Sequence, residues 1–150
     1  MSELDSVSGD ADHGSNMERG MIAVLAVLGG EEIPRSPTEL LKTVGVTIVD
    51  RVGGSSGALY GTIFLRMARA IGDKSLIDGD GFAGALRAGL SGVVERGGAK
   101  GGDKTMYDAL APAVDALEKG LAEGNTFQHS MQCALAAAEA GRDATIHMTA

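Results

Sequence analysis

Three aspartates stand close together near the start of the chain, in the stretch LDSVSGDADHGSNMERG. They are Asp5, Asp10 and Asp12, and Gly9 and Gly14 are placed where the backbone has to turn. Carboxylate oxygens are the natural ligands of hard cations, and Mg²⁺ is usually held by a few carboxylates together with phosphate oxygens. The spacing fits two interpretations, a metal site or a solvated acidic loop that caps the following helix.

The same stretch contains D-x-D-x-G, the beginning of an EF-hand calcium loop, from Asp10 to Gly14. The rest of that pattern is missing. The twelfth position counted from Asp10 is Met21, where a bidentate glutamate belongs, and the sixth is Ser15 instead of glycine. An EF-hand is therefore excluded.

A second segment, VGGSSGALYG at residues 52–61, is rich in glycine and serine and precedes a predicted helix. Exposed backbone N–H groups and hydroxyls at such a position suit a phosphate at the positive end of the helix dipole. A flexible turn with Ser55 or Ser56 as the N-cap residue accounts for the same composition. The segment alone leaves both interpretations open.

A third segment, ERGGAKGGDKTMYDAL at residues 95–110, partly matches a P-loop. Gly97 and Gly102 have the required separation, but an aspartate intrudes before Lys104-Thr105 and no strand is predicted ahead of the loop. A Walker A site is therefore excluded. A nucleotide-binding loop and a plain helix connection remain open.

The chain is acidic, with a formal net charge of -7 over 150 residues. This charge argues against nucleic acid or an anionic membrane as a partner and suits cations. The single cysteine, Cys133, cannot form an internal disulfide, so a reducing compartment is expected, and we predict this side chain to be buried in an alanine-rich helix. Since neither a signal peptide nor a membrane-spanning stretch is evident, we expect a cytoplasmic protein.

Apolar residues recur at helical spacing along most of the chain, which predicts helices and no strand. Residues 44–52 (VGVTIVDRV) have β-branched character, but Ser36, Pro37 and Glu39 form a capping box ahead of them and favour a helix. The helices are expected at about residues 17–28, 37–48, 56–71, from Asp78 or Asp80 to 94, 105–121, and from Asn125 or Thr126 to 141.

Short connections marked by glycine imply antiparallel neighbours. We therefore predict a single all-α domain over residues 1–150, an antiparallel up-and-down helical bundle or barrel. An ion pair between Asp115 and Lys119 is expected within the fifth helix. Glycines inside the predicted helices are expected to mark close helix contacts; these are Gly45, Gly61, Gly84, Gly89 and Gly92.

Taken in this order, the three segments resemble the DhaL family, the nucleotide-binding subunit or domain of dihydroxyacetone kinases. The matching stretches are LDSVSGDADHGSNMERG, GGSSGALYGT and RGGAKGGDKTMYDALAP. The resemblance implies a barrel of antiparallel helices with ADP or ATP at one rim.

The resemblance also implies roles for individual residues. Asp5, Asp10 and Asp12 would bind two Mg²⁺ ions that bridge the nucleotide phosphates, and Thr105 and Met106 would help hold the adenine end. The remaining nucleotide contacts implied are His13, Gly14, Ser15, Asn16, Gly54, Ser55 and Ser56.

Two branches of the family differ in mechanism. In the phosphotransferase-system branch, which the DHGSNMERG continuation resembles more, a phosphohistidine on a DhaM partner rephosphorylates bound ADP, and the resulting ATP phosphorylates dihydroxyacetone held by a DhaK partner. The alternatives are an ATP-dependent kinase domain for dihydroxyacetone or another short ketose, such as erythrulose, and a non-catalytic nucleotide-binding regulator. The family pattern also implies a helix before Leu4 and a further C-terminal segment, neither of which is in this sequence.

Overall fold

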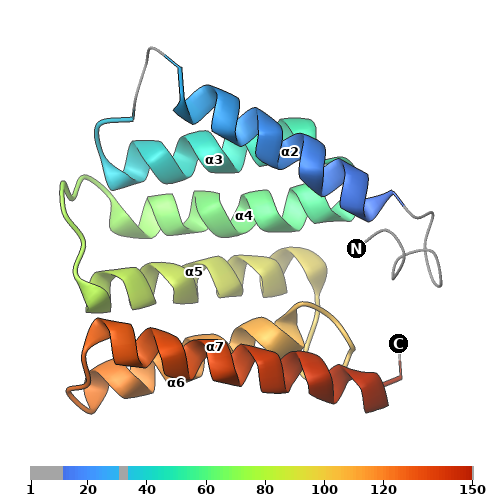
Figure 1. The fold of residues 1–150 in the computed structure, drawn as a ribbon, viewed down its shortest axis with the longest axis vertical. Coiled ribbons are helices and arrows are strands. Elements are labelled where there is room, and N and C mark those ends of the chain that lie inside the picture. Colours follow the sequence, from blue (N-terminus) through green and yellow to red (C-terminus); the bar gives the residue numbers. More distant parts are fainter. Residues whose placement is uncertain (1–11, 31–33, 150) are drawn as a thin grey trace. The chain divides into compact units, whose positions relative to one another are not determined.

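A computed structural model describes residues 12–30 and 34–149 of the chain. Within these ranges all the regular elements are helices, which confirms the all-α prediction. In chain order they are α2 (His13–Leu28), α3 (Pro37–Arg51), α4 (Gly54–Ile71), α5 (Gly79–Gly97), α6 (Tyr107–Ala122), α7 (Phe127–Ala144) and the short 3₁₀ helix η1 (Thr145–His147) (Figure 1).

The chain divides into two compact units, Met1–Ser75 and Leu76–Ala150. The first contains α2, α3 and α4, and the second contains α5, α6, α7 and η1. The single closed domain predicted from the sequence stays a prediction, and the two units are described separately below.

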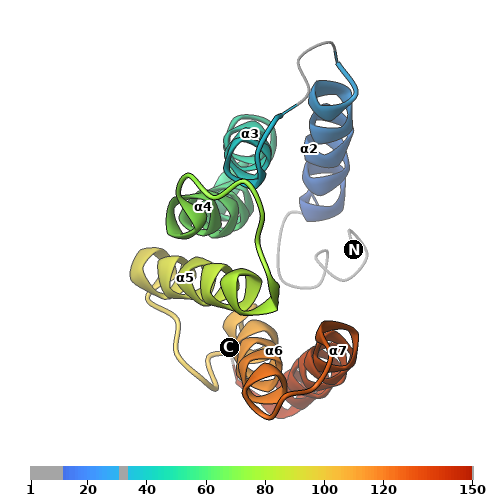
Figure 2. The same ribbon diagram turned by 90° about the vertical axis from the view of Figure 1, so that its left-hand side faces the viewer.

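In the first unit, α3 and α4 lie side by side and run antiparallel, and α2 packs against α3 (Figures 1 and 2). The core of this unit is built on Val24 of α2, Ile48 of α3 and Val52 in the turn after α3. Partly buried side chains surround this core, namely Met17, Leu28, Val44, Tyr60 and Phe64.

Two of the predicted contact glycines bring α3 and α4 together. A Cβ atom at Gly45 would lie 2.8 Å from Cγ of Leu65, and one at Gly61 would lie 3.0 Å from the carbonyl oxygen of Gly45. Neither distance leaves room for a methyl group, so the close-contact prediction is confirmed at these positions. It is wrong at Gly84, which is exposed and whose Cβ position has no atom of another helix within 4 Å.

In the second unit, α6 and α7 form an antiparallel pair and α5 packs against α6 (Figure 1). The core contains Ala83, Leu117 and Ala134, one from each helix. The rings of Phe82 and Phe127 meet edge to face, with centroids 5.6 Å apart.

Three helix starts predicted from capping residues are confirmed. The Oγ of Ser36 accepts from the amide of Glu39 at 3.1 Å, Asp78 accepts from Gly81 at 2.8 Å, and Thr126 accepts from His129 at 3.2 Å. The capping box at α3 differs in one respect, because the Glu39 carboxylate accepts from the amide of Arg35 at 2.7 Å, one residue ahead of the cap.

Other local predictions are wrong. The expected ion pair between Asp115 and Lys119 is not formed. Asp115 pairs with Arg87 of α5 at 2.5 Å, and Lys119 lies 3.9 Å from Glu123. Cys133 is only partly buried, and its Sγ lies 3.8 Å from Nε2 of His129.

In the described part of the chain, no helix is long and apolar enough to cross a membrane.

Candidate nucleotide-phosphate site

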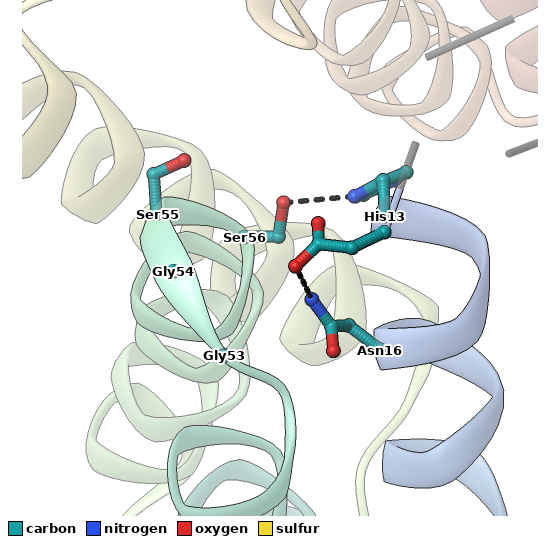
Figure 3. Close-up of a pocket in the computed structure, with 7 residues that line it drawn as sticks. His13, Asn16, Gly53, Gly54, Ser55 and Ser56 are labelled. Atoms are coloured by element: carbon teal, nitrogen blue, oxygen red, sulfur yellow. Dashed lines mark hydrogen bonds between the residues drawn. The ribbon is translucent and has the colours of Figure 1, made fainter. Parts of the chain in front are cut away.

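The first two motif segments meet in a pocket of about 250 Å³ within the first unit (Figure 3). One wall comes from the start of α2 and the other from the turn into α4. The lining residues are Asp12, His13, Asn16, Gly53, Gly54, Ser55 and Ser56. This volume lies just below the roughly 300–1,000 Å³ of small-molecule pockets, so it suits the phosphate part of a nucleotide better than a whole one.

Asp12 immediately precedes α2, but its carboxylate makes no capping hydrogen bond to the helix backbone. Instead Oδ2 accepts from Nδ2 of Asn16 at 2.6 Å, and the backbone carbonyl of Asp12 accepts from Oγ of Ser15 at 2.8 Å. Asp12 is thus the N-cap residue of α2 by position, but its side chain does not cap the helix by a hydrogen bond. Its side chain is exposed and lies at the pocket.

The opposite wall is the N-terminus of α4, which begins at Gly54 with Gly53 as its N-cap residue. The prediction that Ser55 or Ser56 is the N-cap is therefore wrong, since both lie inside the first turn. No side chain caps this helix, and Gly54 has a φ of 68°, in the left-handed region that favours glycine. Backbone N–H groups and the positive end of the helix dipole thus face the pocket beside two hydroxyls.

A side-chain hydrogen bond connects the two walls. Oγ of Ser56 lies 3.0 Å from Nδ1 of His13, and Figure 3 shows the two side chains pointing toward each other. The bond holds the first turn of α4 against the first turn of α2.

Close packing behind the pocket fixes the same two helix ends. A Cβ atom at Gly57 would lie 1.9 Å from the carbonyl oxygen of Val52, and one at Gly20 would lie 2.1 Å from Cγ2 of that residue. Val52 and Gly53 alone connect α3 to α4. Because Gly20 and Gly57 have no side chain, α2 and α4 can approach this two-residue connection closely.

The remaining predicted residues of the first motif lie around the pocket or outside the described ranges. Gly14 and Ser15 are in the first turn of α2, next to the lining residues but not among them. Asp5 and Asp10 fall outside the described residues. Within the described ranges no group of three or more His, Cys, Asp or Glu side chains could hold a metal ion. The oxygen donors at the pocket, above all the Asp12 carboxylate, are of the type that Mg²⁺ prefers.

Thr105 and Met106 belong to the second unit, in the loop that leads into α6. The helix begins at Tyr107, with Met106 as its N-cap residue, so the predicted start at Thr105 is two residues early. The Thr105 hydroxyl accepts from the amide of Tyr107 at 3.2 Å.

Asp108, which sequence reasoning missed, organises this loop. Its buried carboxylate accepts from the amide of Thr105 at 2.9 Å and from the amide of Gly102 at 2.6 Å. These backbone N–H donors, that of Thr105 first, lower the pKa of Asp108 below its usual value. The available signal was its position, three residues after Thr105, within reach of the amides that a helix start leaves unpaired.

Comparison with known proteins gives the family of this chain. The profile described as the DAK2 domain matches residues 7–150. The chain belongs to the DAK2 domain family. The family assignment confirms the resemblance inferred from the three motifs.

Relatives within this DAK2 domain family include named kinase subunits. The chain is 44% identical over 119 residues to the PEP-dependent dihydroxyacetone kinase 1, ADP-binding subunit DhaL, of Listeria innocua, covering 79% of this chain and 59% of that protein. It is 36% identical to the corresponding ADP-binding subunit DhaL of Escherichia coli, covering 98% of this chain and 70% of that protein. An L-erythrulose kinase of Pectobacterium atrosepticum is 36% identical over 93% of this chain, which corresponds to 24% of that protein.

The aligned region thus spans about three fifths of the Listeria subunit and about a quarter of the erythrulose kinase. In these relatives the region that matches this chain is one part of a longer protein.

Proposed function

We propose that this chain is the ADP/ATP-binding subunit of a dihydroxyacetone kinase. It would carry a phosphoryl group, by way of bound ADP and ATP, from a phosphohistidine donor to dihydroxyacetone held by a partner. The observation that carries this proposal is the pocket in which Asp12 and Asn16 face the uncapped start of α4. Relatives named as ADP-binding subunits of dihydroxyacetone kinase support it.

The wall at α4 suits the phosphates of the nucleotide. Gly54, Ser55 and Ser56 offer backbone N–H groups and hydroxyls at the positive end of a helix of 18 residues. His13 and Asn16 offer ring and amide groups from the other side, and Gly14 and Ser15 adjoin them in the same turn. The pocket combines these donors with the Asp12 carboxylate, an arrangement that suits a phosphate carrying a cation.

Asp5, Asp10 and Asp12 would hold two Mg²⁺ ions. When bound, the ions supply positive charge to the phosphate oxygens and to the phosphoryl group in transfer. The chain itself would align the nucleotide, and none of its side chains has to act as a general base. The exposure of Asp12 and its hydrogen bond to Asn16 support a carboxylate held ready at the pocket.

Thr105 and Met106 would contact the adenine end of the nucleotide. The loop that carries them is preorganised by Asp108, which fixes the amides of Gly102 and Thr105. A loop whose backbone is already ordered loses less entropy when a ligand binds.

This chain would supply half of an active site. The hydroxyl that receives the phosphoryl group would be held and activated by a DhaK-like partner, and a DhaM-like phosphohistidine protein would recharge the ADP. The proposed setting is the cytoplasm, with no nucleic acid or membrane partner, in keeping with the net charge of -7.

A second candidate is an ATP-dependent kinase domain for another short ketose, favoured by the similarity to the L-erythrulose kinase. The two functions differ in the phosphoryl donor and in whether the nucleotide leaves after each turnover. ADP that stays with the protein through purification, and phosphoryl transfer only when a phosphohistidine donor is supplied, are expected of the first. Transfer from free ATP in the presence of a DhaK-like subunit, without a phosphohistidine donor, would favour the second.

A further inference from the structure

Arg19 lies next to the pocket on α2, one turn after Asn16, and is not among the lining residues. Its exposed guanidinium makes two hydrogen bonds to different parts of the first unit. Nη2 donates to Oδ1 of Asn16 at 2.7 Å, and Nε donates to the carbonyl oxygen of Arg51 at 3.1 Å. One side chain therefore joins the first motif to the end of α3.

The bond to Asn16 determines how the Asn16 amide is oriented. A guanidinium can only donate and an ionised carboxylate can only accept, so Asn16 must turn Oδ1 toward Arg19 and Nδ2 toward Asp12. The short Asn16 Nδ2 to Asp12 Oδ2 distance of 2.6 Å fits this assignment. Arg19 reinforces the orientation that Asp12 already favours. Without Arg19, Oδ1 of Asn16 loses this donor, and the amide is held in this orientation by the bond to Asp12.

The bond to Arg51 links the same group to the opposite wall. Arg51 is the last residue of α3. At this end of a helix the carbonyl groups lack a partner within the helix, and the helix dipole has its negative end. The turn into α4 follows directly, and Gly53, Gly54 and the two serines on it line the pocket. A cation at this carbonyl therefore helps to set the position of the α4 start relative to Asn16.

We propose that Arg19 is a positioning residue for the phosphate–metal pocket. It orients the Asn16 amide toward the Asp12 carboxylate and fastens this pair to the turn that carries the phosphate-binding backbone. The inference rests on the proposed function for the identity of the ligand. The contacts of Arg19 with Asn16 and Arg51, however, exist in the nucleotide-free chain and can be tested there.

The test uses the full chain with Arg19→Gln and, as a control of equal charge change, Arg69→Gln at an exposed arginine in the last turn of α4. ADP binding is measured by calorimetry across a series of Mg²⁺ concentrations. Losing a partner bonded directly to a metal ligand typically lowers metal affinity by about 10- to 100-fold. Arg19 acts one contact further out, through Asn16, so Arg19→Gln should raise the Mg²⁺ needed for half-maximal ADP binding by about tenfold, the low end of that range. Arg69→Gln should behave like the parent chain.

Arg19→Lys separates positioning from simple attraction of the nucleotide by charge. An ammonium keeps the charge but cannot reproduce the fork that reaches two acceptors, so this variant should remain impaired. Full recovery with lysine would overturn the proposal. So would an Arg19→Gln variant that binds like Arg69→Gln.

A double-mutant cycle tests whether Arg19 acts through Asn16. Once Asn16→Ala has removed the amide, Arg19→Gln should raise the Mg²⁺ requirement by a smaller factor than in the parent chain, because only its bond to the Arg51 carbonyl is left to lose. An equally large effect in that background would contradict the inference.

The side-chain amide NMR signals of Asn16 give a readout without ligand. They should move in Arg19→Gln and stay in place in Arg69→Gln. If the parent chain bound no Mg-ADP while these signals moved, the proposed function would fail and the positioning contact would stand. If the Asn16 signals stayed in place in Arg19→Gln, the positioning contact would be contradicted, whether or not the chain binds nucleotide.

Discussion

Ser56 Oγ and His13 Nδ1 lie 3.0 Å apart, joining the first turns of α4 and α2 across 43 residues of sequence. This bond brings the glycine–serine segment and the acidic motif into one pocket. Each segment alone is compatible with an ordinary turn, whereas together they offer donors for phosphate and a carboxylate for a cation on facing walls.

Removing the Ser56 hydroxyl should weaken ADP binding. Ser56→Ala deletes both the bond to His13 and a hydroxyl at the α4 start, and one hydrogen bond is worth about two- to tenfold in an equilibrium constant. We expect a loss of that size by calorimetry, with little change in melting temperature. Ser91→Ala, at an exposed serine of α5 that bonds the carbonyl of Arg87, is the matched control. Equal affinities for the two variants would argue against a role for Ser56.

Neutralising Asp12 should weaken ADP binding only when Mg²⁺ is present. Asp12→Asn removes a cation ligand and the acceptor for Asn16, so we expect at least about a tenfold loss, the size found when metal sites lose a supporting group. In the absence of Mg²⁺ the same change should leave binding equal or improved, because a negative charge near the phosphates is gone. The control is Asp73→Asn, at an exposed position away from the pocket lining. A loss of the same size without Mg²⁺ would count against a metal ligand.

Gly57→Ala and Gly84→Ala should change stability in opposite directions. A methyl group at Gly57 would meet the Val52 carbonyl oxygen at 1.9 Å, and such overpacking costs about 1–3 kcal/mol. At Gly84 the space is open, so alanine should stabilise the helix by about 0.5–1 kcal/mol. Urea unfolding of the two variants measures both free energies. A Gly57→Ala protein as stable as the parent chain would contradict the packing described behind the pocket.

The contribution of Asp108 to stability should depend on pH. Because its folded-state pKa is lowered, its stabilising effect is fully present above the unfolded value of about 4 and is lost as the pH falls through the folded value. Asp108→Asn should therefore be less stable than the parent chain at pH 7, and this difference should shrink below about pH 4. Urea unfolding at pH 7 and pH 3 measures it, with Asp73→Asn as an exposed control. A difference that does not change with pH would mean that the carboxylate charge is unimportant.

Local signals predicted the elements where the decisive contact is itself local. Each of three side chains accepts from the amide three residues later in the chain, and such contacts follow from chain order alone; they are Ser36, Asp78 and Thr126. Gly141 was expected to end the last helix, yet α7 continues to Ala144. A Cβ atom there would lie 2.2 Å from the carbonyl oxygen of Asp108, so this glycine serves helix packing that a sequence pattern does not show.

The site was predictable to a similar extent. The predicted site residues include all the lining residues except Gly53, but the partners that support them depend on tertiary contacts. Arg19 reaches Arg51 across 32 residues of sequence, and Asp115 finds Arg87 of another helix in place of Lys119. The start of α4 differs from the prediction because Gly53 takes the N-cap position that Ser55 or Ser56 was expected to take, and Gly54, with a left-handed φ, follows it.

Calorimetric titration of the full chain with ADP, with and without Mg²⁺, tests the central claim most directly. The chain must first be freed of any nucleotide it has retained. We predict saturable ADP binding that strengthens when Mg²⁺ is added. A folded, nucleotide-free chain that takes up no ADP at any Mg²⁺ concentration would contradict it.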